Sequence, residues 1–125
     1  WSDLDRFFQE DVVYEVLNSP YHSVVEGRAN VLTAFRRSVQ GFDRKCKRSF
    51  GSDQKFYEEG SNFIVHGTIE YQRGDSPPLQ LSLWEIATYR DGRIARLMDI
   101  YDPGSKEEVE EWMAKWGHGL DPAYV

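Results

Sequence analysis

The chain has 125 residues, of which 40% are hydrophobic and 14% aromatic, and it carries a formal net charge of −6 at pH 7. This length fits one domain over residues 1–125, with enough apolar side chains for one core. The acidic balance argues against a nucleic-acid binder, which needs a basic surface to replace the counterions of phosphates. A single cysteine excludes an internal disulfide. No run approaches the roughly 20 apolar residues of a membrane span, so we expect a cytoplasmic protein that does not bind membranes.

Turn signals divide the chain into short elements. Helical spacing of Leu4 and Phe7 predicts a short opening helix, and the apolar stripe of residues 28–42 predicts a second one. Strands are predicted between them, at 11–17 and 23–26. After Gly41 the pattern changes to long strands, and we expect these at residues 45–58, 63–73, 79–90 and 94–101. A last helix follows Gly104, and residues 117–125 are predicted to form a loose tail.

The fold class follows from this order of elements. Asp91-Gly92 between two apolar runs is a strong hairpin signal, and consecutive strands joined by tight turns indicate an antiparallel sheet. Helices followed by a run of strands indicate an α+β fold with helices on one face of one sheet. Because long strands twist and coil, we expect the sheet to curve into a cone with the helices on its concave side.

Two short segments carry a resemblance to a known family. One is Phe8-Gln9-Glu10-Asp11-Val12-Val13-Tyr14-Glu15, and the other runs from Tyr89-Arg90-Asp91-Gly92 through Asp99-Ile100-Tyr101-Asp102-Pro103. Their order and spacing resemble the nuclear transport factor 2-like superfamily and, within it, the SnoaL-like polyketide cyclase group. The resemblance implies a cone-shaped fold with a pocket for a hydrophobic small molecule. It also implies a long first helix before the start of this chain, of which Trp1 alone could be the last residue.

Three residues are candidates for catalysis. Asp99 lies in an otherwise apolar strand, and burial there would raise its pKa toward values useful for proton transfer. The resemblance implies that an acidic residue at this point is the acid/base group. His66 stands among apolar and small residues, and the resemblance places it in the pocket across from Asp99. Glu85 stands mid-strand beside Trp84, so that Glu85 and Asp99 would form an acid and base pair if both face inward. A structural Asp99, an ordinary strand His66 and a Glu85 paired outward with an arginine are the alternatives.

Other residues are expected to bind the substrate. Strand alternation puts Leu97, Asp99 and Tyr101 on one face of the last strand, and Leu83 and Glu85 on one face of the strand before it. The position that resembles the catalytic base of ketosteroid isomerases is Val16, which cannot abstract a proton, so that mechanism is disfavoured. The predicted substrate-binding set is Tyr14, Val16, Thr68, Leu83, Leu97 and Tyr101.

The sequence thus predicts a cofactor-free acid/base enzyme, a cyclase, isomerase or dehydratase, acting on a polyketide-like or terpenoid-like molecule. No phosphate loop, nucleotide fingerprint or zinc-ligand spacing occurs, so neither cofactor nor metal is expected. The alternatives are a non-catalytic binding or dimerisation module and an epoxide hydrolase-like enzyme. The basic cluster at residues 44–48 is read as a solvated strand edge. An outward stripe of Trp84, Ile86 and Met98 predicts a homodimer through the outer sheet faces.

Overall fold

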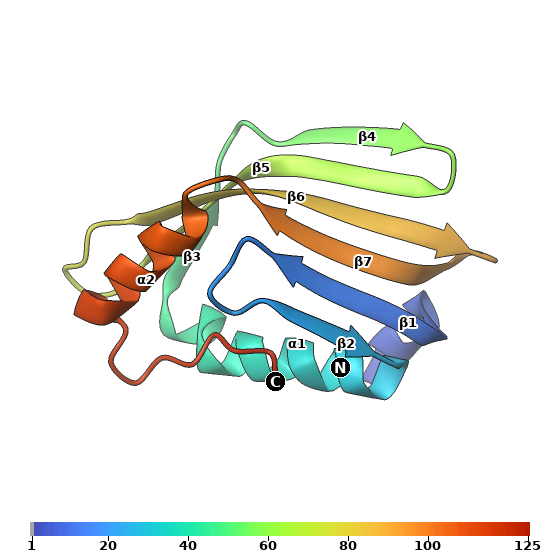
Figure 1. Ribbon diagram of the computed structural model, residues 1–125, viewed down its shortest axis with the longest axis horizontal. Helices are drawn as coiled ribbons and strands as arrows, with labels where there is room; N and C mark the ends of the chain where they lie inside the picture. Colours follow the sequence, from blue (N-terminus) through green and yellow to red (C-terminus); the bar gives the residue numbers. More distant parts are fainter. Residues whose placement is uncertain (1) are drawn as a thin grey trace.

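The computed structural model describes residues 2–125, so Trp1, the expected end of a preceding helix, lies outside the described residues. Figure 1 shows one curved sheet arching over helix α1, with α2 at one end of it. The helices are α1 (Arg28–Gly41) and α2 (Ser105–Trp116), with 3-10 turns η1 (Ser2–Phe7) and η2 (Asp43–Lys45). The strands are β1 (Phe8–Leu17), β2 (Ser23–Glu26), β3 (Lys47–Phe50), β4 (Lys55–Glu59), β5 (Asn62–Gln72), β6 (Leu79–Arg90) and β7 (Arg93–Tyr101).

The sheet is mixed. Its strand order is β2-β1-β7-β6-β5-β3, and β4 also pairs with β5. The predicted hairpin between β6 and β7 is confirmed, with Asp91 and Gly92 both at positive φ. The prediction of an antiparallel sheet needs one correction, because β1 and β7 are parallel. No hairpin links these two strands, and so no short turn constrains their directions. The α+β class with a curved sheet is confirmed.

Both helices cover the concave face. Val31, Leu32 and Ala34 of α1 form one buried cluster with Val12 and Tyr14 of β1. Helix α2 contributes to a second cluster at the other end of the sheet, where Val109 and Trp112 meet Leu79, Leu81 and Tyr71. Two separate clusters leave the middle of the concave face less filled than its two ends, and this is where the pockets described below lie.

The segment predicted as one strand over residues 45–58 is two strands, β3 and β4, which both pair with β5. Between them the ladder is replaced by local bonds. The Gly51 N–H donates to the carbonyl of Thr68 at 2.9 Å, and the Asp53 carboxylate accepts from the backbone and hydroxyl of Thr68. The turn residues Gly51-Ser52-Asp53 therefore break the strand, because the Asp53 side chain replaces a strand partner.

The C-terminal segment, residues 117–125, is held rather than loose. The Asp121 N–H donates to the Gly41 carbonyl at 3.0 Å, and Arg37 forms an ion pair with Asp121 at 3.3 Å. Arg73 of the loop after β5 donates to the carbonyls of Trp116 and His118. Figure 1 shows this segment running back beneath the sheet to α1. The prediction of a loose tail was wrong, because these long-range contacts have no local sequence signal.

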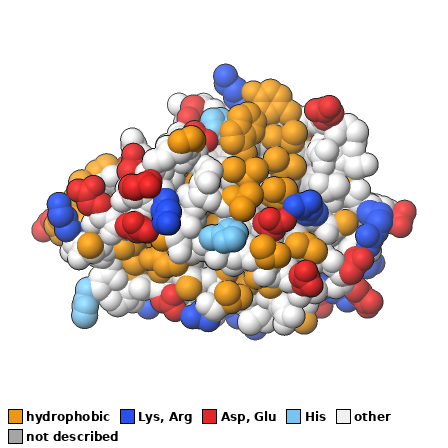
Figure 2. Space-filling model, in the orientation of Figure 1, with side chains coloured by type: hydrophobic (Ala, Val, Ile, Leu, Met, Phe, Trp, Pro, Cys, Tyr) orange, Lys and Arg blue, Asp and Glu red, His pale blue; other side chains and the backbone are white. Residues whose placement is uncertain are grey.

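The outer face of the sheet carries an apolar band. The registers align Tyr57, Ile64, Ile86 and Met98 in one row across β4, β5, β6 and β7, and Trp84 and Ile100 in the next row. Trp84 is 39% exposed and Tyr57 is 45% exposed. Figure 2 shows these side chain types gathered as a hydrophobic band over the strands. None of the described helices is both long and apolar enough to cross a membrane.

Candidate functional site

Pleating brings two carboxyl groups together on the concave face. Val65, Glu85 and Asp99 are successive cross-strand partners on β5, β6 and β7, and Asp99 is the partner of Val16 on β1. Side chains directly opposite one another in a sheet share one face and lie within about 5.5 Å at Cβ. Glu85 and Asp99 are therefore immediate neighbours in the hollow of the sheet, which confirms that both face inward.

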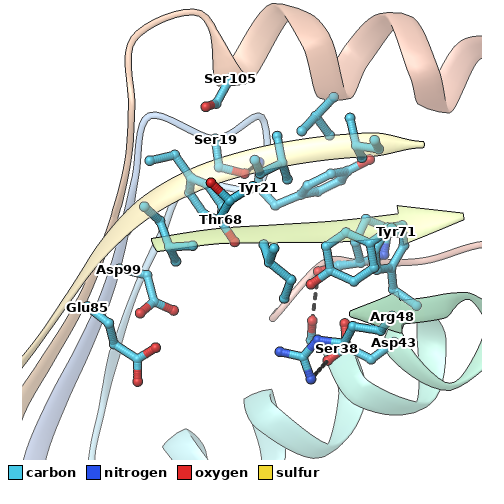
Figure 3. Close-up of a pocket in the computed structure, with 18 of the residues that line it drawn as sticks. Ser19, Tyr21, Ser38, Asp43, Arg48, Thr68, Tyr71, Glu85, Asp99 and Ser105 are labelled. Atoms are coloured by element: carbon cyan, nitrogen blue, oxygen red, sulfur yellow. Dashed lines mark hydrogen bonds and ion pairs between the residues drawn. The ribbon is translucent and has the colours of Figure 1, made fainter. Parts of the chain in front are cut away.

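Two adjoining pockets open on this row. One has a volume of about 180 Å³ and the other, wider one about 460 Å³. They share Ser38, Asp43, Arg48, Val65, Glu85, Asp99 and Tyr124. Figure 3 shows Glu85 and Asp99 side by side at one end of the space, and Asp43, Arg48 and Tyr71 facing them from the other. The shared polar side chains thus mark the junction of one composite cavity with apolar walls.

Asp99 has the environment expected of a proton-transfer group. Its pKa is about 7, because burial and then the negative charge of Glu85 raise it. A hydrogen bond from Tyr14 opposes this rise. The Tyr14 hydroxyl donates to Oδ2 of Asp99. The other oxygen, Oδ1, is inaccessible to solvent and has no hydrogen-bond partner among the described residues. A carboxylate oxygen left without a donor is costly, and so the protonated form of Asp99 is favoured up to neutral pH.

Glu85 differs from Asp99 in its access to solvent. It is exposed, but into the hollow, where it borders both pockets. The surrounding protein nevertheless raises the pKa of Glu85, and the positive charge of Arg48 opposes that rise. The outward pairing with an arginine does not occur, since Arg96 binds Glu15 and Arg73 binds the C-terminal segment. Because two neighbouring carboxyl groups resist losing both protons, the pair titrates as a unit and holds a single proton over an intermediate pH range.

Two phenols adjoin the pair. Burial is the main cause that raises the pKa of Tyr14 far above its ordinary value, and burial raises that of Tyr124 to about 12. Both remain protonated donors at physiological pH. The rings of Tyr14 and Tyr124 meet edge to face, with their centroids 5.4 Å apart. Tyr14 was predicted to bind the substrate, whereas in the structure its hydroxyl proton is directed at Asp99.

Most of the predicted binding residues border the cavity. Leu83, Thr68 and Tyr101 line the smaller pocket, and Tyr14 and Leu97 line the wider one. Val16 does not line either pocket. It is fully buried in the cluster formed with α1, because that helix packs over β1.

His66 does not face the pocket. On β5 it pairs with Trp84, whereas the neighbouring Val65 pairs with Glu85, so that alternation directs His66 to the outer face. Its ring stacks on Trp84 with a centroid distance of 4.2 Å, and its Nε2 lies 3.5 Å from Oδ1 of Asp102. The expectation that His66 lies across from Asp99 was wrong, since His66 directly follows the inward-facing Val65 and successive strand residues face opposite sides.

Several residues of the cavity were not predicted from the sequence, and Arg48, Asp43 and Tyr124 are three of them. Arg48 was assigned to a solvated edge, and Asp43 and Tyr124 were not considered. Arg48 does lie on the edge strand β3, but it pairs with Tyr71, and its side chain borders both pockets. The available signal was that Arg48 and the apolar Phe50, two residues apart in a strand, share one face. The signal for Tyr124 was the one phenol side chain in the C-terminal segment, residues 117–125.

Similar proteins agree with this architecture. A search of curated proteins found no match. The structure of TerC co-crystallised with polyporic acid aligns with a TM-score of 0.64 at 18% identity, covering 87% of this chain and 82% of that one. A putative isomerase from Bacillus subtilis aligns with a TM-score of 0.64 at 20% identity, covering 90% and 79%. An LEH-like epoxide hydrolase of M. tuberculosis aligns at 0.59 and 20% identity, covering 94% and 77%.

These structural likenesses show the fold. The family is shown by a model of the SnoaL-like domain, which matches residues 1–97. That range includes β1, α1, β5 and β6, and it ends within β7, two residues before Asp99. The chain belongs to the SnoaL-like family of the nuclear transport factor 2-like fold.

Proposed function

We propose that the protein is a cofactor-free acid/base enzyme that moves a proton next to a carbonyl group of a hydrophobic small molecule. The observation that carries this proposal is the Glu85 and Asp99 pair, which lies on adjacent strands in a cavity with apolar walls. When one proton is shared by two carboxyl groups, the ionised one accepts a proton and the other donates one. Cyclisation, isomerisation and loss of water all need this pairing of acid and base.

The residues of the site have different roles in this reaction. The ionised carboxyl group of the pair takes the proton from the carbon, and the protonated one returns it or protonates an oxygen. Tyr14 holds Asp99 by its hydroxyl and favours the ionised form of that group. Leu83 and Leu97 supply apolar surface on either side of the pair. The substrate class that suits such walls is a ring compound of polyketide or terpenoid type, and the neighbour crystallised with polyporic acid supports that choice.

Hydrogen exchange tests the proposal without knowledge of the natural substrate. The purified protein is incubated in D₂O with 1-tetralone and related cyclic aromatic ketones, and loss of the proton signal next to the carbonyl is followed by NMR. We expect exchange above the buffer rate, and Asp99→Asn should slow it by about 10² to 10⁴-fold, the usual weight of acid/base catalysis. His66→Gln is the matched control, because His66 lies on the outer face and its loss should leave the rate unchanged.

The outcomes separate the candidate functions. Near-normal exchange in Asp99→Asn rejects the assignment of Asp99. Ketones that bind without enzyme-dependent exchange favour a non-catalytic binding module of the same fold. Hydrolysis of styrene oxide that depends on Asp99, without ketone exchange, favours water activation of the epoxide hydrolase type, to which one similar structure belongs.

We also propose that the outer apolar band pairs with the same band of a second copy of the chain. The band crosses four strands, and partly exposed apolar side chains in adjacent rows form a contiguous patch of the kind that marks an interface. Ile86 stands at its centre between Ile64 and Met98. Light scattering should give a dimer mass at micromolar concentration, and Ile86→Lys should give a monomer with unchanged circular dichroism. A monomeric wild-type protein contradicts this proposal.

A further inference from the structure

Opposite the carboxyl pair the cavity has a positive group. Arg48 pairs with Tyr71, so that its side chain points to the concave side of the edge strand β3. Arg48 is partly exposed, as its neighbours Arg44 and Lys47 are, but it alone of these three residues lines the two pockets. Figure 3 shows the guanidinium end of Arg48 pointing across the open space toward Glu85. This one basic side chain is thus part of the cavity wall.

The surroundings of Arg48 hold its guanidinium in place. Nη1 lies 3.6 Å from Oδ2 of Asp43. The guanidinium carbon stands over the ring of Phe50 at 4.9 Å from the centroid and over that of Tyr71 at 5.9 Å. A guanidinium has five N–H donors, and Asp43 is its only ion-pair partner among the described residues. Donors therefore remain for a further oxygen in the cavity.

Where the two pockets meet, the cavity thus has two chemically different sides. The carboxyl pair on one side exchanges protons, and Arg48 on the other stabilises negative charge on oxygen. Arginine is suited to planar, delocalised anions because its N–H groups form two parallel hydrogen bonds with them. Removal of a proton beside a carbonyl produces such a delocalised anion, and an arginine facing the carboxyl pair would hold its oxygen.

We propose that Arg48 binds an anionic oxygen of the ligand, and that the ligand of this cavity is a hydrophobic ring compound bearing a planar anionic group, a carboxylate or an acidic enol. The reaction that the ligand undergoes rests on the proposed function, but the binding of the ligand by Arg48 does not. Phe50 and Tyr71 beside the guanidinium supply flat apolar surface for the ring that carries the anionic group. The carboxyl pair would then face the part of the ligand away from the charge.

Binding of matched anionic and neutral probes tests this proposal. Tryptophan fluorescence titrations at pH 6 compare 2-naphthoate with 2-naphthamide, and 2-hydroxy-1,4-naphthoquinone with its methyl ether. At this pH Asp99 is mostly protonated, because its pKa is about 7, so it adds little negative charge to the cavity. We expect each anion to bind at least tenfold more tightly than its neutral counterpart. The two pairs of probes distinguish a carboxylate from an acidic enol as the preferred group.

Substitution then assigns the preference to Arg48. Arg48→Met should weaken binding of the anions roughly 10 to 100-fold, the usual weight of charge-assisted hydrogen bonds, and should change binding of the neutral probes less than twofold. Arg48→Lys keeps the charge but loses the planar fork, so its effect should be intermediate. Arg44→Met is the control, since it removes the same charge from an exposed position of the same cluster.

Several results would overturn the proposal. One is equal binding of the anionic and neutral probes to the wild-type protein, and another is no binding of either anion at millimolar concentration. A third is that folded Arg48→Met binds the anionic and the neutral probes more weakly by the same factor. The last result would mean that Arg48 only shapes the cavity. If Arg48→Met does not fold, Arg48→Lys decides, and unchanged discrimination in it counts against the proposal. Anion preference without ketone exchange would refute the proposed proton transfer and leave this binding site standing.

Discussion

Replacing Asp99 by asparagine should stabilise the protein at alkaline pH and much less at acidic pH. In the folded protein the pKa of Asp99 is about 7, against 3.8 for the free group. Because the folded value is the higher one, the folded state holds the proton more tightly than the unfolded chain. The wild-type protein therefore loses stability as the pH rises from about 4 to about 7, whereas the asparagine variant lacks this contribution.

The size of the effect follows from the same values. Each pH unit between the two pKa values changes the free energy of unfolding by about 1.4 kcal/mol. Between pH 5 and pH 8 only the range up to the folded pKa, about two pH units, contributes. The free energy of unfolding of the variant should therefore rise by roughly 3 kcal/mol relative to that of the wild-type protein over this range. Asparagine still offers an oxygen to the Tyr14 hydroxyl, which limits other losses.

Urea unfolding followed by tryptophan fluorescence measures this difference at the two pH values. Asp75→Asn is the control, because Asp75 is exposed in the turn after β5 and its replacement should have the same small effect at both. A difference between Asp99→Asn and the wild-type protein that is equal at pH 5 and pH 8 would refute a buried, proton-retaining Asp99.

Two further predictions concern the pair and the C-terminal segment. Glu85→Gln removes the like charge that, after burial, raises the pKa of Asp99. In urea unfolding, the loss of stability with rising pH should therefore end below pH 7 in this variant, and an unchanged pH range would show that the two groups do not interact. Gly41→Ala places a Cβ 2.0 Å from a backbone oxygen of the C-terminal segment, and should detach that segment and withdraw Tyr124 from the cavity. Hydrogen–deuterium exchange should then accelerate over residues 119–125, and unchanged protection there would contradict the contact.

Sequence patterns predicted faces better than they predicted registers. Alternation along β6 and β7 placed Glu85 and Asp99 with the leucines of their strands, and this was confirmed because strand period is a local property. The position of His66 depended on how β5 aligns with β6. A shift of one residue exchanges the two faces of a strand, and neither composition nor spacing fixes that shift. The resemblance supplied a register for His66, and it was the wrong one.

Arg48 and Tyr124 were missed for a different reason, which is that their positions depend on contacts far away in the sequence. Arg48 enters the cavity because the strand predicted over residues 45–58 breaks at Gly51, which leaves β3 as a short edge strand beside Tyr71. Tyr124 reaches Tyr14 only because distant groups on α1 and after β5 hold the C-terminal segment. Contacts between residues 43 or more positions apart depend on the completed fold, so local propensity does not report them.

The unpaired oxygen of Asp99 bears on why the residue is there. A carboxyl group with a structural task normally has both oxygens satisfied, because an unsatisfied buried oxygen costs stability. In Asp99 one oxygen accepts from Tyr14, while Oδ1 has no partner among the described residues and the neighbouring Glu85 adds a like charge. An asparagine or a leucine would serve the fold better at neutral pH. A residue that weakens the protein at its own position, and borders a cavity with a phenol donor on one side and an arginine opposite, has the properties of a group retained for chemistry.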